Sequence, residues 1–345
     1  MAKVAVLGAG SWGTALSIVL ADNNNDVYLW SHREQLALNI NENQMNEQYL
    51  PEVNLPSNLC ATSDLQEAIQ DAEAVIFVVP TKAIRAVCQQ VKPFLKESQT
   101  VIHAAKGIEP ETNKRVSEMM TDELGETFGD NIVVLSGPSH AEEVGKRLPT
   151  TVTVSSLNMD QAEKAQDLFM NENFRVYTND DLIGVEIGGA LKNIIALGAG
   201  ISDGLGYGDN AKAALITRGL AEMARLGHKL NANPLTFAGL TGVGDLIVTC
   251  TSQHSRNWRA GNMLGKGYVL QDVLEQMGMV VEGVRTTKAV YQFAQKLEVD
   301  MPITKGLYEL IVNEKDPKEV VDQLMKRGRT NELDDLSETL LKNNN

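Results

Sequence analysis

Three glycines close to the start of the chain constrain its fold more than any other feature. Gly8, Gly10 and Gly13 have the spacing G-x-G-x-x-G and come directly after the apolar run Val4–Leu7. Four apolar residues are too few for a helix, but they suit a strand buried on both faces. Gly8 then makes a tight turn, Gly10 lets the backbone approach a pyrophosphate, and Gly13 lets the next helix pack closely on the strand. Free N–H groups at the start of that helix can hold the phosphates.

The residues around the glycines decide between a nucleotide site and an ordinary turn, because the spacing alone also occurs in glycine-rich turns. A helical pattern of apolar residues follows over 15–20, and Asp26–Trp30 has the pattern of a second strand at the distance expected for this unit. The order strand, glycines, helix, strand therefore predicts that the chain binds NAD or NADP.

The residues after the second strand bear on the choice between the two cofactors. A free ribose 2′-hydroxyl is usually held by an acidic residue about twenty positions past the glycines. This sequence has His32 and Arg33 at that place instead. A cationic side chain can meet the 2′-phosphate of NADP, so the pair favours NADP(H) without excluding NAD(H). The alternative is a solvated pair of residues after a strand, since arginine is mostly exposed.

Further strand-like runs alternate with helical stretches up to about residue 180. Residues 34–70 have the pattern of helices and polar loops, with an irregular segment at Pro51 and Pro56. Alternating strands and helices predict an α/β fold with a parallel, doubly wound sheet, and hence a dinucleotide-binding domain of the Rossmann type over residues 1–180. The expected strands are Ala74–Val79, Thr100–Ala104, Asn131–Leu135, Thr150–Val154 and Phe174–Tyr177.

From residue 181 onward strand-like runs are rare and long helical segments take over, with Val185–Ala199 the most apolar. We therefore expect residues 181–345 to form a mainly α-helical domain that carries the substrate and the catalytic groups. The polar end of the chain, Lys342–Asn345, has the composition of a frayed tail.

Several chemically distinctive residues follow predicted strands of the first domain. In doubly wound sheets the ligand lies beyond the carboxyl ends of the strands. Pro80, Lys106 and the loop Ser136–Ala141 all occur at such ends, so we expect them to converge on one crevice. A single lysine after a strand is usually solvated, but the crevice of a nucleotide-binding sheet favours a functional role for Lys106.

One lysine, Lys192, stands in an almost wholly apolar helical segment of the second domain. Gly188 lies four residues earlier on the same helix face and leaves room for something to approach. The lysine either extends its ammonium group to the surface or is held in a partly dry cleft, where its pKa falls toward the range useful for acid–base chemistry. The glycine pair at 188–189, each of which weakens a helix by roughly 1 kcal/mol, favours the cleft.

Two polar segments follow in the helical domain. Gly239–Leu246 is rich in glycine and carries one carboxylate, Asp245. Ser255, Arg256 and Asn257 have the donors that a phosphate needs, a bidentate fork and two further hydrogen-bond donors. They also fit a helix N-cap followed by a solvated face. The segment Val280–Gly283 is compatible with a helix start or with a loop that contacts the cofactor.

Composition excludes several classes of partner. The net charge of −14 argues against nucleic acid or an anionic membrane, and an anionic substrate needs a local basic site. We find no stretch that approaches the roughly twenty apolar residues of a membrane span, and a strand that begins within three residues leaves no room for a signal peptide. Three cysteines and five histidines lack metal-ligand spacing, which predicts no metal site and suits a reducing cytoplasm.

Together these motifs resemble the NAD(P)-dependent glycerol-3-phosphate dehydrogenases of the bacterial type. The resemblance extends over nearly the whole chain, except the last dozen or so residues. It implies reduction of dihydroxyacetone phosphate to sn-glycerol 3-phosphate, the backbone for phospholipid synthesis, in a cytoplasmic enzyme that fits a dimer through its helical domain. The motifs are GAGSWGTAL near the start, AAKG at 104–107, LSGPSHAEEV at 135–144, E-x-G-G-A-L-K-N at 186–193, GVGDL at 242–246, SRN at 255–257 and VVEG at 280–283.

The resemblance also assigns roles to single positions. It makes Lys192 the proton donor and acceptor, and it places Lys106 against both cofactor and substrate. Arg256 is expected to reach the cofactor as well as the substrate. The other implied cofactor residues are Ser11, Trp12, His32, Arg33, Ala141, Val280 and Glu282, and the other substrate residues are Gly137, Ser139, Asp245, Ser255 and Asn257.

A mechanism follows as a hypothesis. Hydride transfer to the carbonyl carbon places negative charge on the oxygen, and Lys192 gives that oxygen a proton. Arg256 and Lys106 would lower the pKa of Lys192 by like-charge repulsion, while Asp245 orients it or a substrate hydroxyl. Two alternatives remain open at this point: a related dehydrogenase for another small hydroxy acid or phosphorylated substrate, and a non-catalytic NAD(P) sensor.

Overall fold

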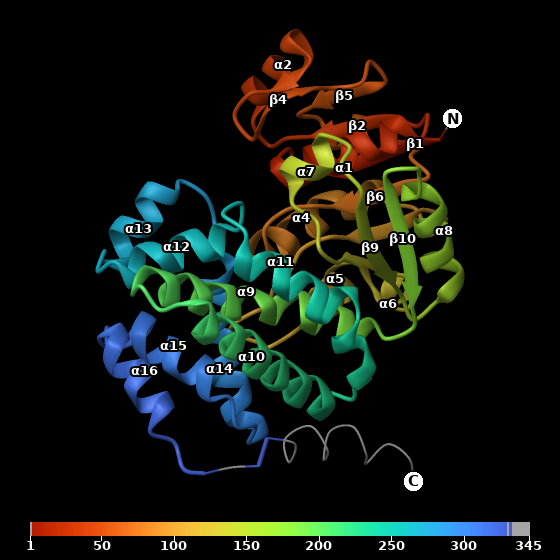
Figure 1. Cartoon of the computed structure of the whole chain (residues 1–345). Helices are drawn as coiled ribbons and strands as arrows, with labels where there is room; N and C mark the ends of the chain where they lie inside the picture. The colour runs from red at the N-terminus through yellow and green to blue at the C-terminus, as the bar shows by residue number, and fades with distance from the viewer. Residues whose placement is uncertain (1, 330, 333–345) are drawn as a thin grey trace. The chain divides into compact units, whose positions relative to one another are not determined.

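The computed structural model describes residues 2–329, 331 and 332 (Figure 1). The chain forms two compact units, each described by itself below. The first comprises residues 2–105 and 116–182, and the second comprises residues 106–115 and the described residues from 183 onward. Residues 106–115 thus leave the first unit and belong with the second, so a single division between residues 180 and 181 does not describe the chain. The polar tail 342–345 lies outside the described residues.

An eight-stranded sheet forms the middle of the first unit, with the strand order β10-β9-β8-β7-β6-β1-β2-β5. Every neighbouring pair is parallel except β8 and β9, which are antiparallel, so the expectation of a wholly parallel sheet is wrong at that place. A parallel crossover usually needs a helix that spans the sheet, whereas the connection 137–149 contains only the five-residue helix α7. The strands are β1 (Lys3–Leu7), β2 (Asp26–Trp30), β5 (Leu59–Thr62), β6 (Ala74–Phe77), β7 (Thr100–His103), β8 (Val133–Ser136), β9 (Thr150–Ser155) and β10 (Phe174–Asn179).

All seven predicted strands of the large sheet are present, with ends shifted by at most two residues. The segment 34–70, expected to hold helices and loops, also contains three strands. The edge strand β5 continues the large sheet beyond β2, and β3 (Met45–Asn46) pairs with β4 (Leu50–Asn54) in a separate antiparallel ribbon. The strand β4 was not expected because it contains Pro51. Proline has no N–H to donate to a β-ladder and is confined mainly to edge strands.

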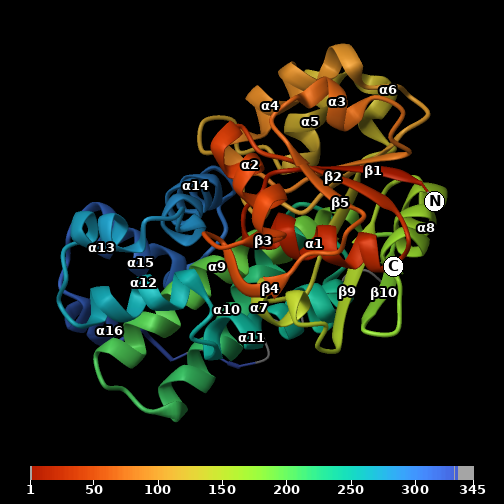
Figure 2. The same ribbon diagram turned by 90° about the horizontal axis from the view of Figure 1, so that it is seen from above.

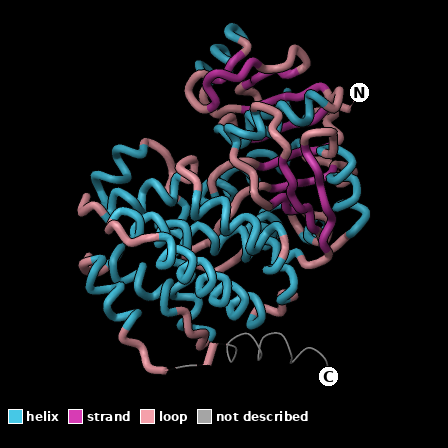
Figure 3. Tube along the Cα trace, viewed as in Figure 1, coloured by secondary structure: helices cyan, strands magenta, loops and turns pink. Residues whose placement is uncertain are grey.

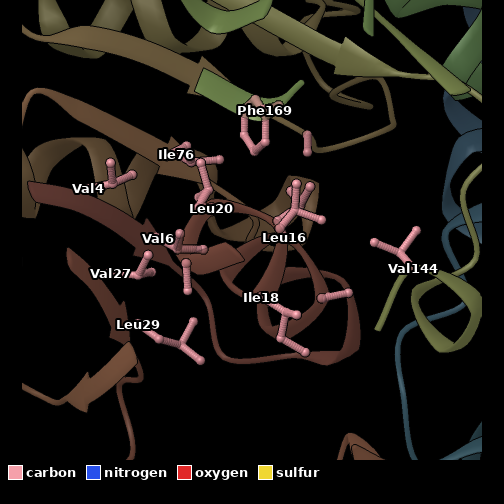
Figure 4. Packing of buried hydrophobic residues seen from close by; sticks show 14 of the residues in the cluster. Val4, Val6, Leu16, Ile18, Leu20, Val27, Leu29, Ile76, Val144 and Phe169 are labelled. Atoms are coloured by element: carbon pink, nitrogen blue, oxygen red, sulfur yellow. The ribbon is translucent and has the colours of Figure 1, made fainter. Parts of the chain in front are cut away.

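Alternate residues of β1 face two different cores, as a strand buried on both faces requires. Val4 and Val6 pack with α1 (Ser11–Asp22), α2 (Glu34–Asn43), α7 (Ala141–Gly145) and α8 (Met159–Phe169) (Figure 4). Ala5 and Leu7 pack with the helices on the other face, which gather on one side of β1 and β2 in Figure 2. These are α3 (Leu65–Ile69), α4 (Ile84–Val91), α5 (Val116–Leu124) and α6 (Glu126–Gly129). The doubly wound arrangement is therefore confirmed.

The second unit is built from helices, and no described strand lies beyond residue 179 (Figure 3). This confirms the expected change from strands to helices near residue 181. A short 3₁₀ segment, Pro234–Ala238, and a π-helical turn, Leu240–Gly244, connect two of the helices. The helices are α9 (Leu182–Gly204), α10 (Asp209–Lys229), α11 (Asp245–Thr251), α12 (Arg256–Gly265), α13 (Leu270–Met277), α14 (Glu282–Leu297), α15 (Pro302–Val312) and α16 (Pro317–Met325).

The helix α9 is the core of this unit. A side chain at Gly200 would meet the Trp258 carbonyl oxygen at 2.0 Å, and one at Gly261 would meet the Leu197 carbonyl oxygen at 2.0 Å, so α9 and α12 pack backbone against backbone. By length and composition α9 is long and apolar enough to cross a membrane, which corrects the expectation that no stretch approaches such a span. Its most apolar window is 94% buried, as in a core helix.

Candidate active site

The glycine-rich turn after β1 has the geometry that its spacing predicts. Gly8 has a φ of +123°, and a side chain there would meet the Val78 carbonyl oxygen at 2.7 Å. A side chain at Gly13 would meet the Gly8 carbonyl oxygen at 1.8 Å, so α1 packs directly on the turn. At Gly10, by contrast, an added side chain would meet nothing within 4 Å. The turn is therefore tight at its two ends and open at Gly10, where no side-chain cap or acidic residue occupies the start of α1.

A buried asparagine that sequence analysis did not single out holds this turn. Asn46, fully buried in β3, donates to the Ala9 carbonyl oxygen at 3.1 Å and to the Thr14 hydroxyl at 2.8 Å. It thereby ties the middle of the glycine turn to the first helical turn of α1. Its only signal in the sequence was an amide in a segment without a clear pattern, so it could not be found from spacing.

The pair after β2 lies at the carboxyl end of that strand, as expected. His32 is exposed, with its ring 6.5 Å from that of Trp30. Arg33 is half-buried and donates from Nη2 to the Tyr49 hydroxyl at 2.8 Å. Its Nε is buried and has no hydrogen-bond partner within the described part of the chain. Arg33 is therefore a half-buried side chain held by Tyr49, rather than a fully solvated residue.

The loop after β8 is the second constrained turn of the first unit. Gly137 has a φ of +135°, and a side chain there would lie 3.0 Å from the Cα atom of Val152. The Ser139 hydroxyl donates to the Gly137 carbonyl oxygen at 2.9 Å, and Ala141 begins α7. The glycine turn and this loop follow β1 and β8, whose carboxyl ends lie at the same edge of the sheet.

Lys192 is only 8% exposed in the middle of α9, which decides between the two alternatives for it in favour of burial. Gly188 leaves room for a close approach to α9, and the backbone at Thr241 fills that room. A side chain at Gly188 would lie 2.5 Å from the Thr241 carbonyl oxygen. The missing side chain thus brings the segment that leads into Asp245 against α9.

Lys192 forms a cluster with three other polar side chains of the second unit, Asp245, Thr249 and Lys106. Its Nζ donates to Asp245 Oδ1 at 2.5 Å and to the Thr249 hydroxyl at 2.8 Å. Lys106 Nζ donates to the other carboxylate oxygen, Oδ2, at 2.6 Å. The Thr249 hydroxyl donates to the Asp245 carbonyl oxygen at 2.6 Å. Both lysines and the aspartate are among the residues expected from the sequence, whereas Thr249 is not; its one signal is its place one helical turn after Asp245.

The pKa of Lys192 is lowered to about 8, first by burial and then by repulsion from Lys106, against the opposing attraction of Asp245. Arg256, which we expected to contribute, is not among the principal causes. For Asp245, burial acts to raise the pKa, but the two ammonium groups outweigh it and hold the pKa below its usual range. The cluster therefore pairs a stable carboxylate with a lysine poised for proton transfer near neutral pH.

The backbone directly before Asp245 has an unusual conformation. Leu240–Gly244 forms a π-helical turn, a rare conformation that often marks functional sites, and α11 begins directly after it at Asp245. A side chain at Gly242 would meet the Phe237 carbonyl oxygen at 1.9 Å. Gly242 thus permits the tight winding of this segment, and Gly188 of α9 permits the segment to pack on that helix.

The residues Ser255, Arg256 and Asn257 lie at the start of a helix, as expected from the alternative of a helix N-cap. The Ser255 hydroxyl caps α12 by accepting from the Trp258 N–H at 3.2 Å. Arg256, the first residue of that helix, is exposed. Asn257 is buried, donates to Asn193 Oδ1 at 2.8 Å and accepts from the Gly283 N–H at 2.8 Å. Asn193, next to Lys192, was not anticipated as a partner.

The Asn257 contact also accounts for the segment Val280–Gly283. Glu282 begins α14, so this segment is a helix start. Its backbone is held by Asn257, which joins the beginnings of α12 and α14 to α9. Val280 and Glu282 are half-buried at that junction. Among the described residues there is no group of three histidine, cysteine or acidic side chains that could hold a metal ion.

The predicted site residues fall into two sets. The first unit carries the glycine turn, Ser11, Trp12, His32, Arg33 and the loop from Gly137 to Ala141. The second unit brings Lys106, Lys192 and Asp245 into direct contact and holds Asn257 against the neighbour of Lys192. Lys106, expected beside Pro80 at the sheet, belongs to the second unit.

Comparisons with known proteins agree with these features. A model of the N-terminal part of NAD-dependent glycerol-3-phosphate dehydrogenase matches residues 3–162, and a model of its C-terminal part matches residues 181–322. Glycerol-3-phosphate dehydrogenase (NAD(P)+) of Oceanobacillus iheyensis is 65% identical over 337 residues, which cover 98% of this chain and 97% of the relative. The enzyme of that name from Bacillus subtilis is 63% identical over 339 residues, 98% of each chain.

A solved structure extends the comparison to three dimensions. The crystal structure of glycerol-3-phosphate dehydrogenase from Coxiella burnetii is 38% identical, with a TM-score of 0.90, and the match covers 94% of this chain and 99% of that one. Both halves of the chain and its full-length relatives lead to the same group of enzymes. The chain therefore belongs to the family of NAD(P)-dependent glycerol-3-phosphate dehydrogenases.

Proposed function

We propose that this protein catalyses the reversible NAD(P)H-dependent reduction of dihydroxyacetone phosphate to sn-glycerol 3-phosphate, which supplies glycerophospholipid synthesis. The observation that carries the proposal is the buried contact of Lys192 with Asp245, in a chain whose relatives bear the name of this enzyme. A buried lysine with a pKa of about 8 is a proton donor for ketone reduction and an acceptor for the reverse reaction.

The first unit fits a dinucleotide. The open space at Gly10 leaves the backbone accessible to a pyrophosphate, and the first turn of α1 offers the N–H groups of Ser11 and Trp12. Ala141 from the first unit and Val280, Glu282, Lys106 and Arg256 from the second complete the proposed cofactor residues. NAD(P)H, when bound, supplies the hydride for the carbonyl carbon.

Proton transfer is the task of the second unit. The Lys192 ammonium gives its proton to the carbonyl oxygen as the new C–H bond forms, leaving a neutral amine that regains a proton from water. Asp245 holds the Lys192 ammonium through Oδ1, and Thr249 fixes the same Nζ from a second direction. The Lys106 ammonium, which donates to Asp245 Oδ2, offers positive charge to the oxygen that develops negative charge.

The start of α12 is the proposed anchor for the substrate phosphate. Arg256 is exposed there, with a planar fork that suits a phosphate, and Ser255 stands beside it at the N-terminus of the helix. Asn257 contributes by holding this helix start to α9, next to Lys192. Gly137 and Ser139 complete the proposed substrate contacts. Binding energy from the phosphate then helps to place the carbonyl for reaction.

We also propose that NADPH is the preferred reductant. Arg33 is ordered by Tyr49 and keeps a buried Nε without a partner in the described chain, and His32 is exposed beside it. Two such side chains at the end of β2 suit the 2′-phosphate, whereas the free 2′-hydroxyl of NADH calls for an acidic residue. The Arg33→Ala variant should then raise KM for NADPH much more than KM for NADH.

The test is the loss of nicotinamide absorbance when purified protein is mixed with dihydroxyacetone phosphate and NADPH or NADH. Rapid oxidation that requires the phosphate group supports the proposal, and dihydroxyacetone without phosphate is the matched control. If the protein binds NADPH or NADH but no phosphorylated ketone leads to oxidation of the cofactor, the proposal is refuted. That result would favour a non-catalytic sensor of NAD(P).

A further inference from the structure

We propose that the buried ion pair between Arg115 and Glu186 is a positioning device, which clamps the excursion 106–115 onto α9 and so sets the place of Lys106 at Asp245. Neither Arg115 nor Glu186 reaches the lysine–aspartate cluster through a contact described above. The inference rests on the proposed function only for its kinetic consequences; the placement of Lys106 can be measured without catalysis.

The excursion is a compact hairpin with a functional residue at one end and the clamp at the other. Ile108 and Arg115 form an antiparallel bridge, and the Glu109 N–H donates to the Lys114 carbonyl oxygen at 3.0 Å. The two ends of the hairpin are thereby held together. Any displacement of Arg115 is therefore passed to Lys106, two residues before the bridge.

Besides the contact of Lys106 with Asp245, Ile108 and Arg115 hold the hairpin to the helical unit. Ile108 is 1% exposed and belongs to the hydrophobic core of that unit. Arg115 Nη1 lies 2.5 Å from Glu186 Oε2, and the Glu186 side chain is only 4% exposed. Apolar burial fixes depth but has little directional preference, whereas a charge-assisted hydrogen bond also fixes orientation. Since a buried ion pair adds little net stability, its main effect here is geometric.

The clamp ties Lys106 to the helix that carries the other lysine. Glu186 lies six residues before Lys192 in α9, roughly 9 Å along the helix axis. Asp245 accepts from both lysines, so the separation of the two ammonium groups depends on where the hairpin sits on α9. Arg115 and Glu186 act through Lys106, and they are not themselves catalytic residues.

Kinetics of Arg115→Met, which keeps side-chain length but removes the fork, test the inference. We expect kcat/KM to fall about ten- to hundred-fold, mainly through kcat, because a small misplacement of a reacting group is costly. Arg85→Met is the matched control, since Arg85 pairs with Glu123 at 2.9 Å in the first unit, outside the proposed site. Arg115→Lys, which restores a positive charge, should recover part of the activity.

A double-mutant cycle separates positioning from a general structural role. If Arg115 acts through Lys106, Lys106→Met combined with Arg115→Met is no slower than Lys106→Met alone. Losses that multiply in the double variant would overturn the inference, and so would full activity in Arg115→Met.

The pH profile is a second readout. Asp245, Lys106 and the Cys250 thiol face Lys192, and burial raises the pKa of Cys250 to about 12, so that thiol stays neutral. When Lys106 moves away, Lys192 loses a repulsive neighbour and its pKa rises above about 8. Reduction by Arg115→Met should then persist to higher pH than in the wild type, and an unchanged profile would count against the clamp.

Trace labelling of lysines with acetic anhydride, read by mass spectrometry, needs no turnover. Lys106 should label faster in Arg115→Met than in the wild type, with Lys229 as the internal reference. Equal labelling overturns the positioning inference even if the enzyme is active. An inactive wild type that still shows faster labelling in the variant would refute the proposed function and leave the clamp standing. Glu186→Gln serves for the same measurements if Arg115→Met does not fold.

Discussion

The Nζ atom of Lys192 lies 2.5 Å from Oδ1 of Asp245, and this carboxylate is shared with a second ammonium group at Oδ2. One aspartate between two protonated lysines leaves the buried cluster with an excess positive charge. Release of a proton from Lys192 leaves Lys106 and Asp245 as a neutral pair, which is easier to keep out of water. The stoichiometry of the cluster thus favours the transfer that ketone reduction requires.

Replacing Lys192 with alanine should reduce kcat by about 10²- to 10⁴-fold, the usual contribution of a general acid. The dissociation constant for NADPH should stay within a few-fold of the wild type, because the glycine turn is in the other unit. Stopped-flow turnover and fluorescence titration of the cofactor measure the two quantities. Lys229→Ala, at an exposed position in α10, is the control. A Lys192→Ala enzyme with near-normal kcat would remove this lysine from the mechanism.

The pH dependence of kcat should have opposite signs in the two directions. Reduction needs the Lys192 ammonium, so its rate should fall as pH rises through about 8, where the group loses its proton. Oxidation of glycerol 3-phosphate needs the neutral amine and should rise through the same range. Steady-state rates from pH 6 to 10 in both directions check this. Parallel profiles would assign the titration to another group.

Much of the first unit was predictable because its signals are local. A side chain at Gly13 is excluded by the carbonyl oxygen of Gly8, only five residues earlier, once β1 and α1 are formed. A side chain at Gly8 is excluded by Val78, which follows β6, so that contact also needs the pairing of β1 with β6. The strand β4 was missed because Pro51 breaks its pattern, and the antiparallel β8–β9 pair was missed because the decisive connection has only a short helix. Pairing partners are set by topology, which a run of apolar residues does not encode.

The lysine–aspartate cluster was predictable in part for a different reason. Lys192 stood out as a charge in an apolar helix, and Asp245 as the single carboxylate of a glycine-rich segment. Thr249 and Asn193 have no such contrast with their surroundings, and only the packing of α11 and α12 against α9 reveals their contacts. The composition of residues 106–115 does not indicate that they belong to the second unit. Only Ile108 of this polar stretch packs in the hydrophobic core of that unit.

Asn46→Ala should weaken cofactor binding without affecting the proton-transfer residues. Loss of the amide leaves the Ala9 carbonyl oxygen and the Thr14 hydroxyl without this buried donor and loosens the glycine turn. A buried group that loses its partner costs about 1–3 kcal/mol, so we expect a rise of roughly 5- to 150-fold in the dissociation constant for NADPH. Isothermal titration calorimetry gives the value, with Asn39→Ala on the exposed face of α2 as control. Equal affinity in both variants would exclude a role for Asn46.

Gly188→Ala tests how α9 and the π-helical turn set the lysine–aspartate contact. The added methyl group would lie 2.5 Å from the Thr241 carbonyl oxygen, a backbone atom that cannot rotate away. The turn must then move off α9 and carry Asp245 with it, since α11 begins there. Overpacking of this kind costs about 1–3 kcal/mol, so the thermal midpoint should fall by several degrees.

The kinetic signature of Gly188→Ala is distinct from simple destabilisation. The attraction of Asp245 raises the pKa of Lys192, and it weakens as Asp245 moves away. The pH at which the rate of ketone reduction falls should therefore shift from about 8 to a lower value. Gly208→Ala is the matched control, because a side chain there would meet nothing within 4 Å. The shift is measured at a temperature well below both thermal midpoints. If Gly188→Ala keeps the wild-type limb while its midpoint falls, the close approach at Gly188 serves packing alone and the position of Asp245 is set elsewhere.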